Sequence, residues 1–334
     1  MVTSTSPSPW RLSVAPMMDW TDRHCRYFHR QITRRTRLYT EMVTTGALLH
    51  GDADRLLHTD PIEPPVALQL GGSDPAHLAQ CVRLASKWNY DEINLNCCCP
   101  SERVQRGAFG ACLMAEPRLV ADCVKAMCDA TDLPVTVKQR TGIDRTENYA
   151  FMRDFVGTVS AAGCRVFIIH ARNAWLKGLS PKQNREIPPL HYDWVYQLKR
   201  EFPELTIVLN GAVKANAEIA GHLQHVDGVM LGRQAYHDPW AMSTWDATFF
   251  GEPSAPRTRE QAEAAMLSYM ERESAERGTL WNAIARHFLG LYHGEPGARL
   301  WRQAWSDPAL KRTPVEQVAA TARARRRNDT LVCA

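Results

Sequence analysis

The sequence predicts an α/β protein, a (β/α)8 barrel of the TIM type followed by a small all-α domain. Eight short apolar runs, rich in β-branched residues, recur along the first two-thirds of the 334-residue chain, as expected for parallel strands buried on both faces. Helical patterns separate most of these runs. Beyond residue 250 the pattern becomes helical throughout, and no strand signal appears.

Each predicted strand is three to five residues long and nearly all apolar. The predicted strands are 12–15, 38–42, 66–70, 93–97, 135–138, 166–170, 207–210 and 229–231. The predicted helices between them are 74–87, 117–130, 149–162, 194–201 and 215–223. A doubly wound sheet would carry a G-x-G-x-x-G turn after its first strand. Here Pro16, Met17, Met18 and Asp19 follow instead, which favours the barrel.

The segment G-E-P-S-A-P (251–256) is typical of a linker, so we predict a barrel domain over 1–250 and a helical domain over 251–334. The helical patterns there are 259–277, 280–292, 297–306 and 314–327. Nine Lys or Arg and three Asp or Glu lie between residues 286 and 327, including the consecutive Arg325, Arg326 and Arg327. A solvated helix end is the alternative for this basic run. For Trp301 and Trp305, four residues apart, core packing is expected.

Composition limits the functional classes only mildly. The net charge of +4 permits a nucleic-acid partner without requiring one. The N-terminus lacks the pattern of a signal peptide, and no apolar run approaches the roughly 18 residues that span a bilayer. We therefore expect a cytoplasmic protein whose ten cysteines are reduced thiols. No Cys-x-x-Cys with His at zinc spacing occurs, so no metal site is predicted.

Polar side chains occur at six of the eight predicted strand ends, where a barrel of this kind carries its active site. The polar residues are Gln69, Asn94, Asn96, Lys138, Gln139, Arg140, His170, Arg172, Asn210 and Arg233, and Gly211 and Gly232 lie beside the last two. A hydrogen-bonded core position explains any one of them, but not the set. Asn210-Gly211 and Gly232-Arg233 follow the last two strands, where such barrels often hold a phosphate. Gln69, Asn96 and Lys138 suit a flat heterocycle, and Lys138 suits the N1/O2 edge of FMN.

Cys97, Cys98 and Cys99 lie where the fourth strand ends. A thiol at a strand end can act as a nucleophile or an acid. The alternative is that all three are small buried core residues.

Segments spread through the barrel resemble the tRNA-dihydrouridine synthases, in that family's order. They are A-P-M-M-D-W-T-D (15–22), L-Y-T-E-M-V (38–43), L-Q-L-G-G (68–72), N-x-x-C-P (96–100), V-K-x-R (137–140), H-A-R (170–172), N-G (210–211) and L-G-R (231–233). The segments 175–190 and 288–302 resemble the branch that modifies uridines 20 and 20a of the tRNA D-loop.

This resemblance implies FMN as cofactor, NADPH as electron donor, and the D-loop of tRNA as substrate. Hydride would pass from the reduced flavin to C6 of uracil, and Cys99 would protonate C5. The implied flavin contacts are Pro16, Met17, Gln69, Lys138, His170, Asn210, Gly211, Gly232 and Arg233. Asn96, Arg140 and Arg172 would lie near the flavin–uracil junction, and Arg325, Arg326 and Arg327 would hold the RNA backbone. Neither a membrane nor a stable protein partner is expected.

Two positions depart from the family pattern. Cys98 stands where the family has Gly before the catalytic Cys, and Gln139 stands where this branch commonly has His. A side chain at 98 can crowd a ligand that normally meets bare backbone. Two alternatives therefore stay open: another FMN barrel acting on a free pyrimidine, of the dihydroorotate or dihydropyrimidine dehydrogenase type, and a tRNA-binding protein whose catalysis is lost.

Overall fold

The computed structural model describes residues 7–252 and 257–332 and divides into two compact units. The first unit runs up to Arg23 and from Arg35 to Gly232, and the second contains His24–Arg34 and the chain from Arg233 onward. Residues 233–250 thus group with the helical unit. The functional boundary at 250/251 stays a prediction, and most of the linker segment, 253–256, lies outside the described residues.

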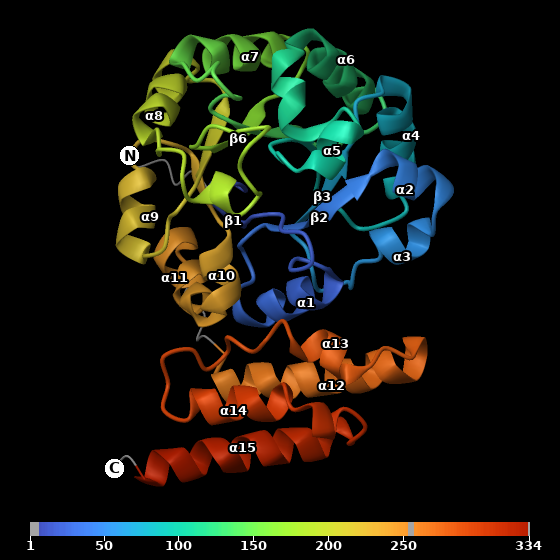
Figure 1. Ribbon diagram of the computed structural model, residues 1–334, viewed down its shortest axis with the longest axis vertical. Helices are drawn as coiled ribbons and strands as arrows, with labels where there is room; N and C mark the ends of the chain where they lie inside the picture. The colour runs from blue at the N-terminus through green and yellow to red at the C-terminus, as the bar shows by residue number, and fades with distance from the viewer. Residues whose placement is uncertain (1–6, 253–256, 333–334) are drawn as a thin grey trace. The chain divides into compact units, whose positions relative to one another are not determined.

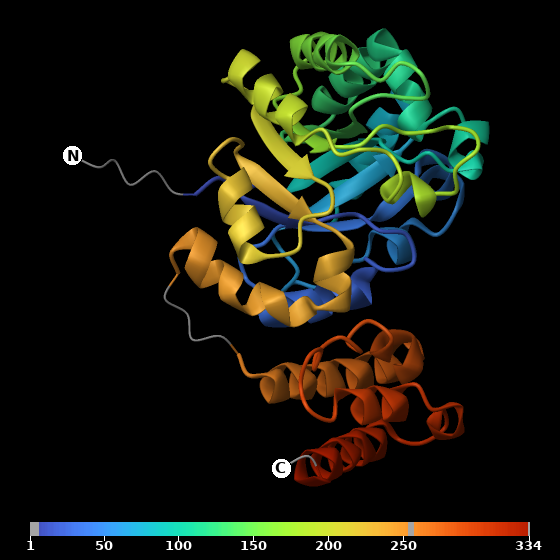
Figure 2. The same cartoon turned by 60° about the vertical axis from the view of Figure 1, so that its left-hand side comes forward.

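The first unit is a parallel eight-stranded barrel surrounded by helices (Figure 1). Figure 2 shows the strand arrows side by side. The strands are β1 Leu12–Val14, β2 Leu38–Thr44, β3 Val66–Gly71, β4 Glu92–Cys97, β5 Val135–Arg140, β6 Val166–His170, β7 Thr206–Asn210 and β8 Gly228–Leu231. All eight predicted strands are confirmed, with ends that differ by at most two residues.

The sheet order is β1-β8-β7-β6-β5-β4-β3-β2, so the first strand pairs with the last. Leu12 lies beside Val229 in this pairing. On its other side β1 bonds to the residue that precedes β2: Val14 N donates to Arg37 O (2.9 Å) and Arg37 N to Leu12 O (3.0 Å). These bonds close the barrel and leave no free sheet edge between β1 and β2.

The surrounding helices begin at recognisable caps. The helices are α2 Thr45–His50, α3 Ala53–Leu57, α4 Pro75–Ala85, α5 Glu102–Arg106, α6 Pro117–Cys128, α7 Tyr149–Ala161, α8 Tyr192–Glu201 and α9 Asn216–His222. Asp74 caps α4 by accepting from His77 N, with Pro75 at the first turn, and Asn148 caps α7 by accepting from Phe151 N. The five predicted barrel helices are confirmed. The short α2, α3 and α5 were not predicted, because they span too few residues for a clear period.

Two kinds of side chain fill the barrel interior. One is an apolar cluster that includes Tyr39, Ile168 and Met230. The other is Glu92 at the start of β4, which is fully buried. One Glu92 oxygen accepts from Tyr39 OH (2.7 Å), and the other accepts from Trp10 Nε1 (2.7 Å) and pairs with Arg37 (3.3 Å). A buried carboxylate is tolerated when it is paired in this way.

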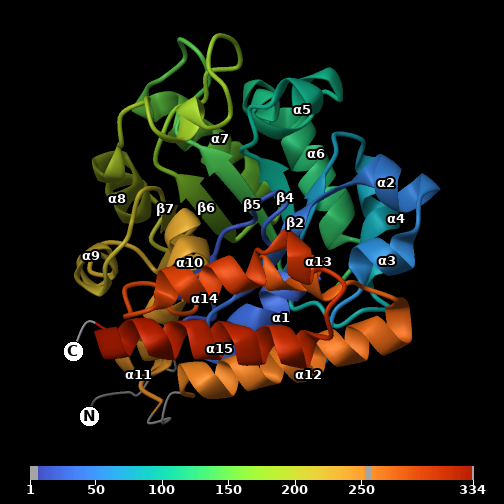
Figure 3. The ribbon, with the colours of Figure 1, turned by 60° about the horizontal axis from the view of Figure 1, so that its bottom comes forward.

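The second unit is all-α in the residues that the structure describes (Figure 3). Its helices are α1 Arg23–Ile32, whose first residue belongs to the barrel unit, α10 Arg233–His237, α11 Trp245–Phe250, α12 Arg259–Arg277, α13 Trp281–Ala285, α14 Ala298–Trp305 and α15 Val315–Val332. Helix α15 packs against both α12 and α14. The prediction of α12 is confirmed, and those of α14 and α15 are confirmed with shifted ends. The helix predicted over 280–292 is wrong in length.

The chain after α13 continues as successive turns, in which Gly290 approaches other backbone too closely for a side chain. A Cβ at Gly290 would lie 2.6 Å from Pro239 Cδ and 2.7 Å from His237 O. Turn bonds follow one another there, including Phe288 N to Ala285 O and Leu291 N to Phe288 O. The apolar spacing that predicted a long helix comes from residues that are buried in these turns.

An aromatic core holds the second unit together. Trp301 is fully buried and Trp305 nearly so, as the sequence predicted, and both rings contact Phe288 edge-on. Buried Glu263 accepts from Tyr292 OH (3.2 Å) and Trp301 Nε1 (3.3 Å). Helix α1 joins this unit through Tyr27, which stacks on Tyr269 at 3.8 Å between ring centroids.

No helix in the described ranges is both long enough and apolar enough to span a membrane.

Candidate active site

The loop of Cys98, Cys99 and Pro100 that follows β4, called the cysteine loop, is held in place by the side-chain amide of Asn96. Asn96, on β4, points its Oδ1 at two backbone N–H groups, those of Cys98 (3.1 Å) and Cys99 (3.0 Å). The loop is closed from its other side by Ala111 N, which donates to Cys99 O (2.9 Å), next to Gly110 at φ +79°. A Cβ at Gly110 would lie 2.6 Å from Cys99 O, so only glycine fits there.

Asn96 is the upper end of a chain of hydrogen bonds through the barrel interior. Asn96 Nδ2 donates to Gln69 Oε1 (2.9 Å), and Gln69 Nε2 donates to Asn94 Oδ1 (2.7 Å). Asn94 Nδ2 donates to Thr136 Oγ1 (2.7 Å), which donates to Glu92 (2.5 Å). Every donor therefore points from the cysteine loop toward the buried carboxylate. This chain fixes the amides of Gln69 and Asn96, while their predicted flavin and substrate contacts stay predictions.

At the strand ends, three of the predicted residues, Lys138, Asn210 and His170, lie around Cys98. The buried Nζ of Lys138 lies 3.1 Å from Asn210 Oδ1 and 3.5 Å from Cys98 Sγ. Cys98 Sγ lies 4.0 Å from His170 Nδ1. Asn210 is held in turn by donating to Met230 O (2.8 Å). A buried ammonium held by an amide oxygen and a sulfur also fits a ligand with an electron-rich edge, as a flavin has.

Burial and repulsion by neighbouring cations lower the pKa values of Lys138 and His170. Burial lowers the pKa of Lys138, and Cys98 offsets that shift only in part. Burial also lowers the pKa of His170 to well below its usual value, and the cations of Arg140 and Lys138 lower it further. His170 is therefore a neutral ring at physiological pH.

At the barrel mouth, the region around the carboxyl ends of the strands, Arg140 and Arg172 donate hydrogen bonds to backbone carbonyls. Arg140 donates to Cys98 O (3.0 Å), Asn173 O (2.9 Å) and Asn184 O (2.8 Å). Arg172 donates to Pro188 O. The two guanidinium groups thereby tie the segment 175–190 to the strand ends, and Arg140 also ties it to the cysteine loop. Direct contact of either residue with a substrate stays a prediction.

The remaining predicted barrel residues lie at the ends of β1, β7 and β8. Gly211 has φ +135°, and a Cβ there would meet His170 Cδ2 at 3.3 Å, so this approach favours glycine. A Cβ at Gly232 would lie 3.7 Å from Met17 Sδ, which places the segment after β1, Pro16 and Met17, beside the end of β8. Arg233 is the first residue of α10, in the second unit.

Cys99 differs from its two neighbours in being partly exposed, whereas Cys97 and Cys98 are buried. Its Sγ lies 3.5 Å from Ser101 Oγ. The residues directly after it border a pocket of about 520 Å³. This pocket is lined by Pro100, Ser101, Glu102, Leu176, Gly178, Leu179, Ser180 and Pro181. A partly exposed thiol beside an open pocket is available to a substrate.

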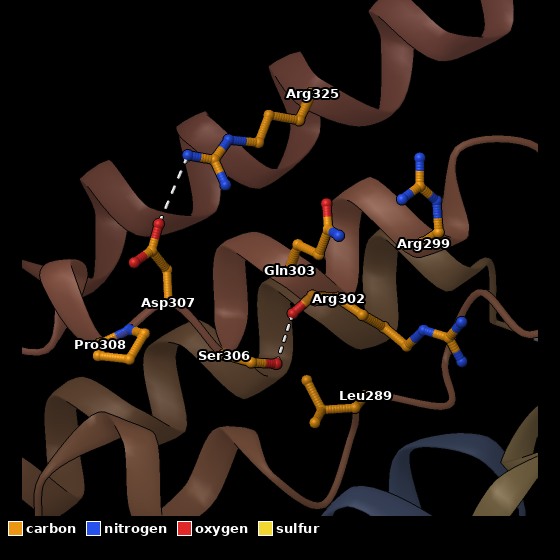
Figure 4. A pocket seen from close by; sticks show the side chains of 8 residues that line it. All are labelled: Leu289, Arg299, Arg302, Gln303, Ser306, Asp307, Pro308 and Arg325. Atoms are coloured by element: carbon orange, nitrogen blue, oxygen red, sulfur yellow. Dashed lines mark hydrogen bonds and ion pairs between the residues drawn. The ribbon is translucent and has the colours of Figure 1, made fainter.

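The second unit carries a groove of about 610 Å³ with three arginines (Figure 4). Its lining is Leu289, Arg299, Arg302, Gln303, Ser306, Asp307, Pro308 and Arg325. Arg299 and Arg302 lie one turn apart on the exposed face of α14, opposite buried Trp301 and Trp305. Arg325 reaches the groove from α15 and pairs with Asp307 at 3.6 Å.

The three consecutive arginines therefore have different surroundings. Arg326 lies with its guanidinium 3.8 Å from the centroid of the Tyr292 ring and pairs with Glu260 (3.6 Å). Arg327 is exposed. Only Arg325 of the three lines the groove. Sequence reasoning did not select Arg299 and Arg302, although their spacing opposite the two tryptophans was a usable signal.

Among the described residues, no group of three or more His, Cys, Asp or Glu side chains is arranged to hold a metal ion.

A parallel barrel with a buried lysine, a neutral imidazole and a partly exposed thiol at its strand ends is typical of an α/β-barrel enzyme, and these groups suit a flat, electron-rich ligand. The family model described as dihydrouridine synthase (Dus) matches residues 13–326. The chain belongs to this family of flavin-dependent oxidoreductases.

Three relatives are similar along nearly their whole length. A protein of Xanthomonas axonopodis pv. citri is 58% identical over 90% of this chain and 89% of its own. One of Escherichia coli K12 is 58% identical over 90% and 87%, and one of Salmonella typhimurium LT2 is 57% identical over 92% and 93%. Each bears the name tRNA-dihydrouridine(20/20a) synthase.

A solved complex of 2-naphthoyl-CoA reductase has the same fold, with a TM-score of 0.53 over 70% of this chain at 9% identity. The chain spans about half of that structure, 49% of its length. This likeness supports the barrel architecture alone.

Proposed function

We propose that this protein reduces uridine to 5,6-dihydrouridine in the D-loop of cytoplasmic tRNA, at positions 20 and 20a, with FMN as cofactor and NADPH as electron donor. The observation that carries the proposal is the 57–58% identity to synthases of that name over at least 90% of the chain. This identity extends through the barrel and into the helical unit.

The strand-end residues fit FMN in two places. Lys138 is the buried cation that would face the N1/O2 edge of the ring, with Gln69 and neutral His170 nearby. At the ends of β7 and β8, the backbone N–H groups of Gly211 and Gly232 would bind a phosphate, and Arg233 would add a positive charge. Pro16 and Met17 would lie along the ring edge.

When bound, the reduced flavin would supply a hydride to C6 of the uracil. Cys99 would supply the proton to C5, which requires that its thiol be neutral and reach the ring from the strand end. Asn96 would hold the cysteine loop in register for that transfer, and Arg140 would hold the loop's carbonyl. Because a stacked base is inaccessible to these groups, the uridine has to leave the tRNA loop.

A flipped base needs a grip on the RNA backbone elsewhere, and the groove of α14 and α15 supports this role. Arg299, Arg302 and Arg325 present three guanidinium groups around one concave surface. Such groups bind phosphates without reading base identity. We therefore assign the RNA grip to these three residues together with exposed Arg327, and a mainly structural role to Arg326.

The Cys99→Ala variant tests the catalytic assignment. Loss of a general acid lowers a rate by about 10²–10⁴-fold, so dihydrouridine formation should fall by that factor while flavin absorbance and tRNA affinity stay unchanged. Cys128→Ala, at a partly exposed cysteine on α6, is the matched control. Near-normal product formation by Cys99→Ala would refute the role.

The substrate assignment is tested with the purified protein and in cells. NADPH should be consumed with unmodified tRNA but not with free uracil or orotate; consumption with a free base would favour a free-pyrimidine oxidoreductase. Mass-spectrometric mapping of tRNA from cells lacking the protein should show uridine at 20 and 20a. Unchanged dihydrouridine there, together with a colourless purified protein, would favour a tRNA-binding protein without catalysis.

A further inference from the structure

The proposed reaction uses one thiol, Cys99, but the barrel mouth contains a second sulfur with different surroundings. Cys98 Sγ lies among side chains of β5 and β6, buried to 7% exposure, and it faces Lys138 and His170 rather than the pocket beside Cys99. Nothing in the proposed proton transfer uses this sulfur.

The charged groups around Cys98 are cations. Lys138 Nζ is its donor at 3.5 Å. Arg140 donates to the carbonyl of Cys98 itself at 3.0 Å, and two further carbonyls hold that guanidinium in place. The imidazole of His170, at 4.0 Å, is neutral, and neighbouring Cys97 is a buried thiol whose own pKa is raised by burial.

Burial and these cations act on Cys98 in opposite directions. Burial raises the pKa of the Cys98 thiol, but the charges and hydrogen bonds of Lys138 and Arg140 together outweigh it, so the pKa lies below its usual value. A sulfur and an amine this close titrate as a pair, and the ionised form of the pair is a thiolate beside an ammonium.

We propose that Cys98 is a buried thiolate nucleophile, ion-paired with Lys138, and that it is the cysteine of this site that soft electrophiles modify. The site thus holds two adjacent sulfurs with opposite tasks. Cys99 is the proton donor of the proposed reaction, and Cys98 carries the negative charge. With iodoacetamide as the electrophile, a bond forms between Cys98 Sγ and the methylene carbon while the carbon–iodine bond breaks. Iodide leaves, and no proton moves because the sulfur is already ionised.

Labelling by iodoacetamide distinguishes this proposal from simple exposure. Exposure alone predicts that Cys99 reacts before Cys98. We expect the opposite order at pH 7 in the purified full-length protein, read by fragmentation of the peptide that contains both residues. Lys138→Met should slow labelling of Cys98 several-fold, because it removes the cation that favours the ionised sulfur. Lys125→Met, at an exposed lysine on α6, should leave it unchanged. Faster labelling of Cys99, unaffected by Lys138→Met, would overturn the proposal.

The infrared S–H stretching band gives a second measurement that needs neither reagent access nor a folded Lys138 variant. A Cys98 thiolate contributes no S–H absorption, so wild type and Cys98→Ser should give the same band at pH 7. Extra S–H intensity in wild type would show a neutral Cys98 and overturn the proposal. Neither measurement uses tRNA or NADPH, so a negative result leaves the proposed reaction in place.

Discussion

The cations at the barrel mouth and those of the helical groove contrast in what surrounds them. At the mouth, Lys138, Arg140 and Arg172 are buried, and their partners include backbone carbonyls, an amide oxygen and a sulfur. In the groove, Arg299 and Arg302 are exposed on one helix face, and Arg325 is partly exposed beside a single carboxylate.

This contrast indicates that the buried cations position loops of the site, whereas the exposed arginines attract the substrate. A buried guanidinium with three carbonyl partners has one geometry and transmits it to the loops it holds. Exposed arginines keep their hydration and their freedom, so they attract any polyanion, and salt screens that attraction. The same residue type therefore builds a site in one unit and recruits a substrate in the other. Four substitutions test this division.

The largest effect is expected at the mouth, from Asn96→Ala. This change leaves the buried N–H groups of Cys98 and Cys99 without their acceptor, which costs about 1–3 kcal/mol per group, and it releases the loop that carries the acid. A misplacement of this kind lowers catalysis about 100-fold. The measurement is single-turnover dihydrouridine formation beside denaturant unfolding. Asn96→Asp keeps the acceptor and should recover most of the rate; an equal loss in both variants would show that the clamp is not the cause.

In the groove, Arg302→Ala should weaken tRNA binding by several-fold and reduce the slope of log K against log salt by about 1. Flavin reduction by NADPH should not change. Arg326→Ala is the matched comparison, because it removes a ring contact and an ion pair within the unit; we expect it to lower the melting temperature with less effect on the salt slope. An unchanged slope for Arg302→Ala would exclude a phosphate contact there.

His29 of the helical unit should stay neutral in the folded protein, as His170 does at the barrel mouth, because burial lowers the pKa of both residues. Burial lowers the pKa of His29 to about 3, with smaller contributions from His287 and Arg30. The unfolded chain takes up this proton near pH 6.5, so stability is fully present above that pH. It should decrease by about 1.4 kcal/mol per pH unit as the pH falls toward 3. Denaturant unfolding at pH 6 and pH 5 measures the slope, and His29→Gln should reduce it by one proton's share. Equal slopes in the two proteins would argue against a neutral His29.

The smallest effect is expected for Gln139, which lies on β5 between Lys138 and Arg140. Both amide atoms of Gln139 are buried and find no hydrogen-bond partner in the described part of the chain, and strand alternation turns this side chain away from Lys138 and Arg140. Gln139→Leu should therefore raise the unfolding free energy by about 1 kcal/mol and leave dihydrouridine formation unchanged. Gln139→Glu, which buries a charge at this position, should lower the unfolding free energy.

The strands were predictable because each is a continuous apolar run between polar loops. Eight such runs that alternate with helical patterns are typical of a parallel barrel. The turns after α13 were not, because the close approach of Gly290 to His237 depends on tertiary packing. In the site, the polar strand ends marked the right positions. The clamp by Asn96 and the carbonyl partners of Arg140 depend on strand register and side-chain rotamers, which one sequence does not encode in its local pattern.

The closure of the barrel has a consequence for how the chain reaches its fold. Leu12 has its strand partner at Val229, so β1 obtains that neighbour only after nearly the whole barrel has left the ribosome. Until then the pairing surface of β8 is missing, and the apolar strands that have already been made are exposed along an open edge. Pairings so far apart in sequence are slow to form because a long loop must close first. We therefore expect the first unit to complete its fold only late in synthesis, after β8 has been made.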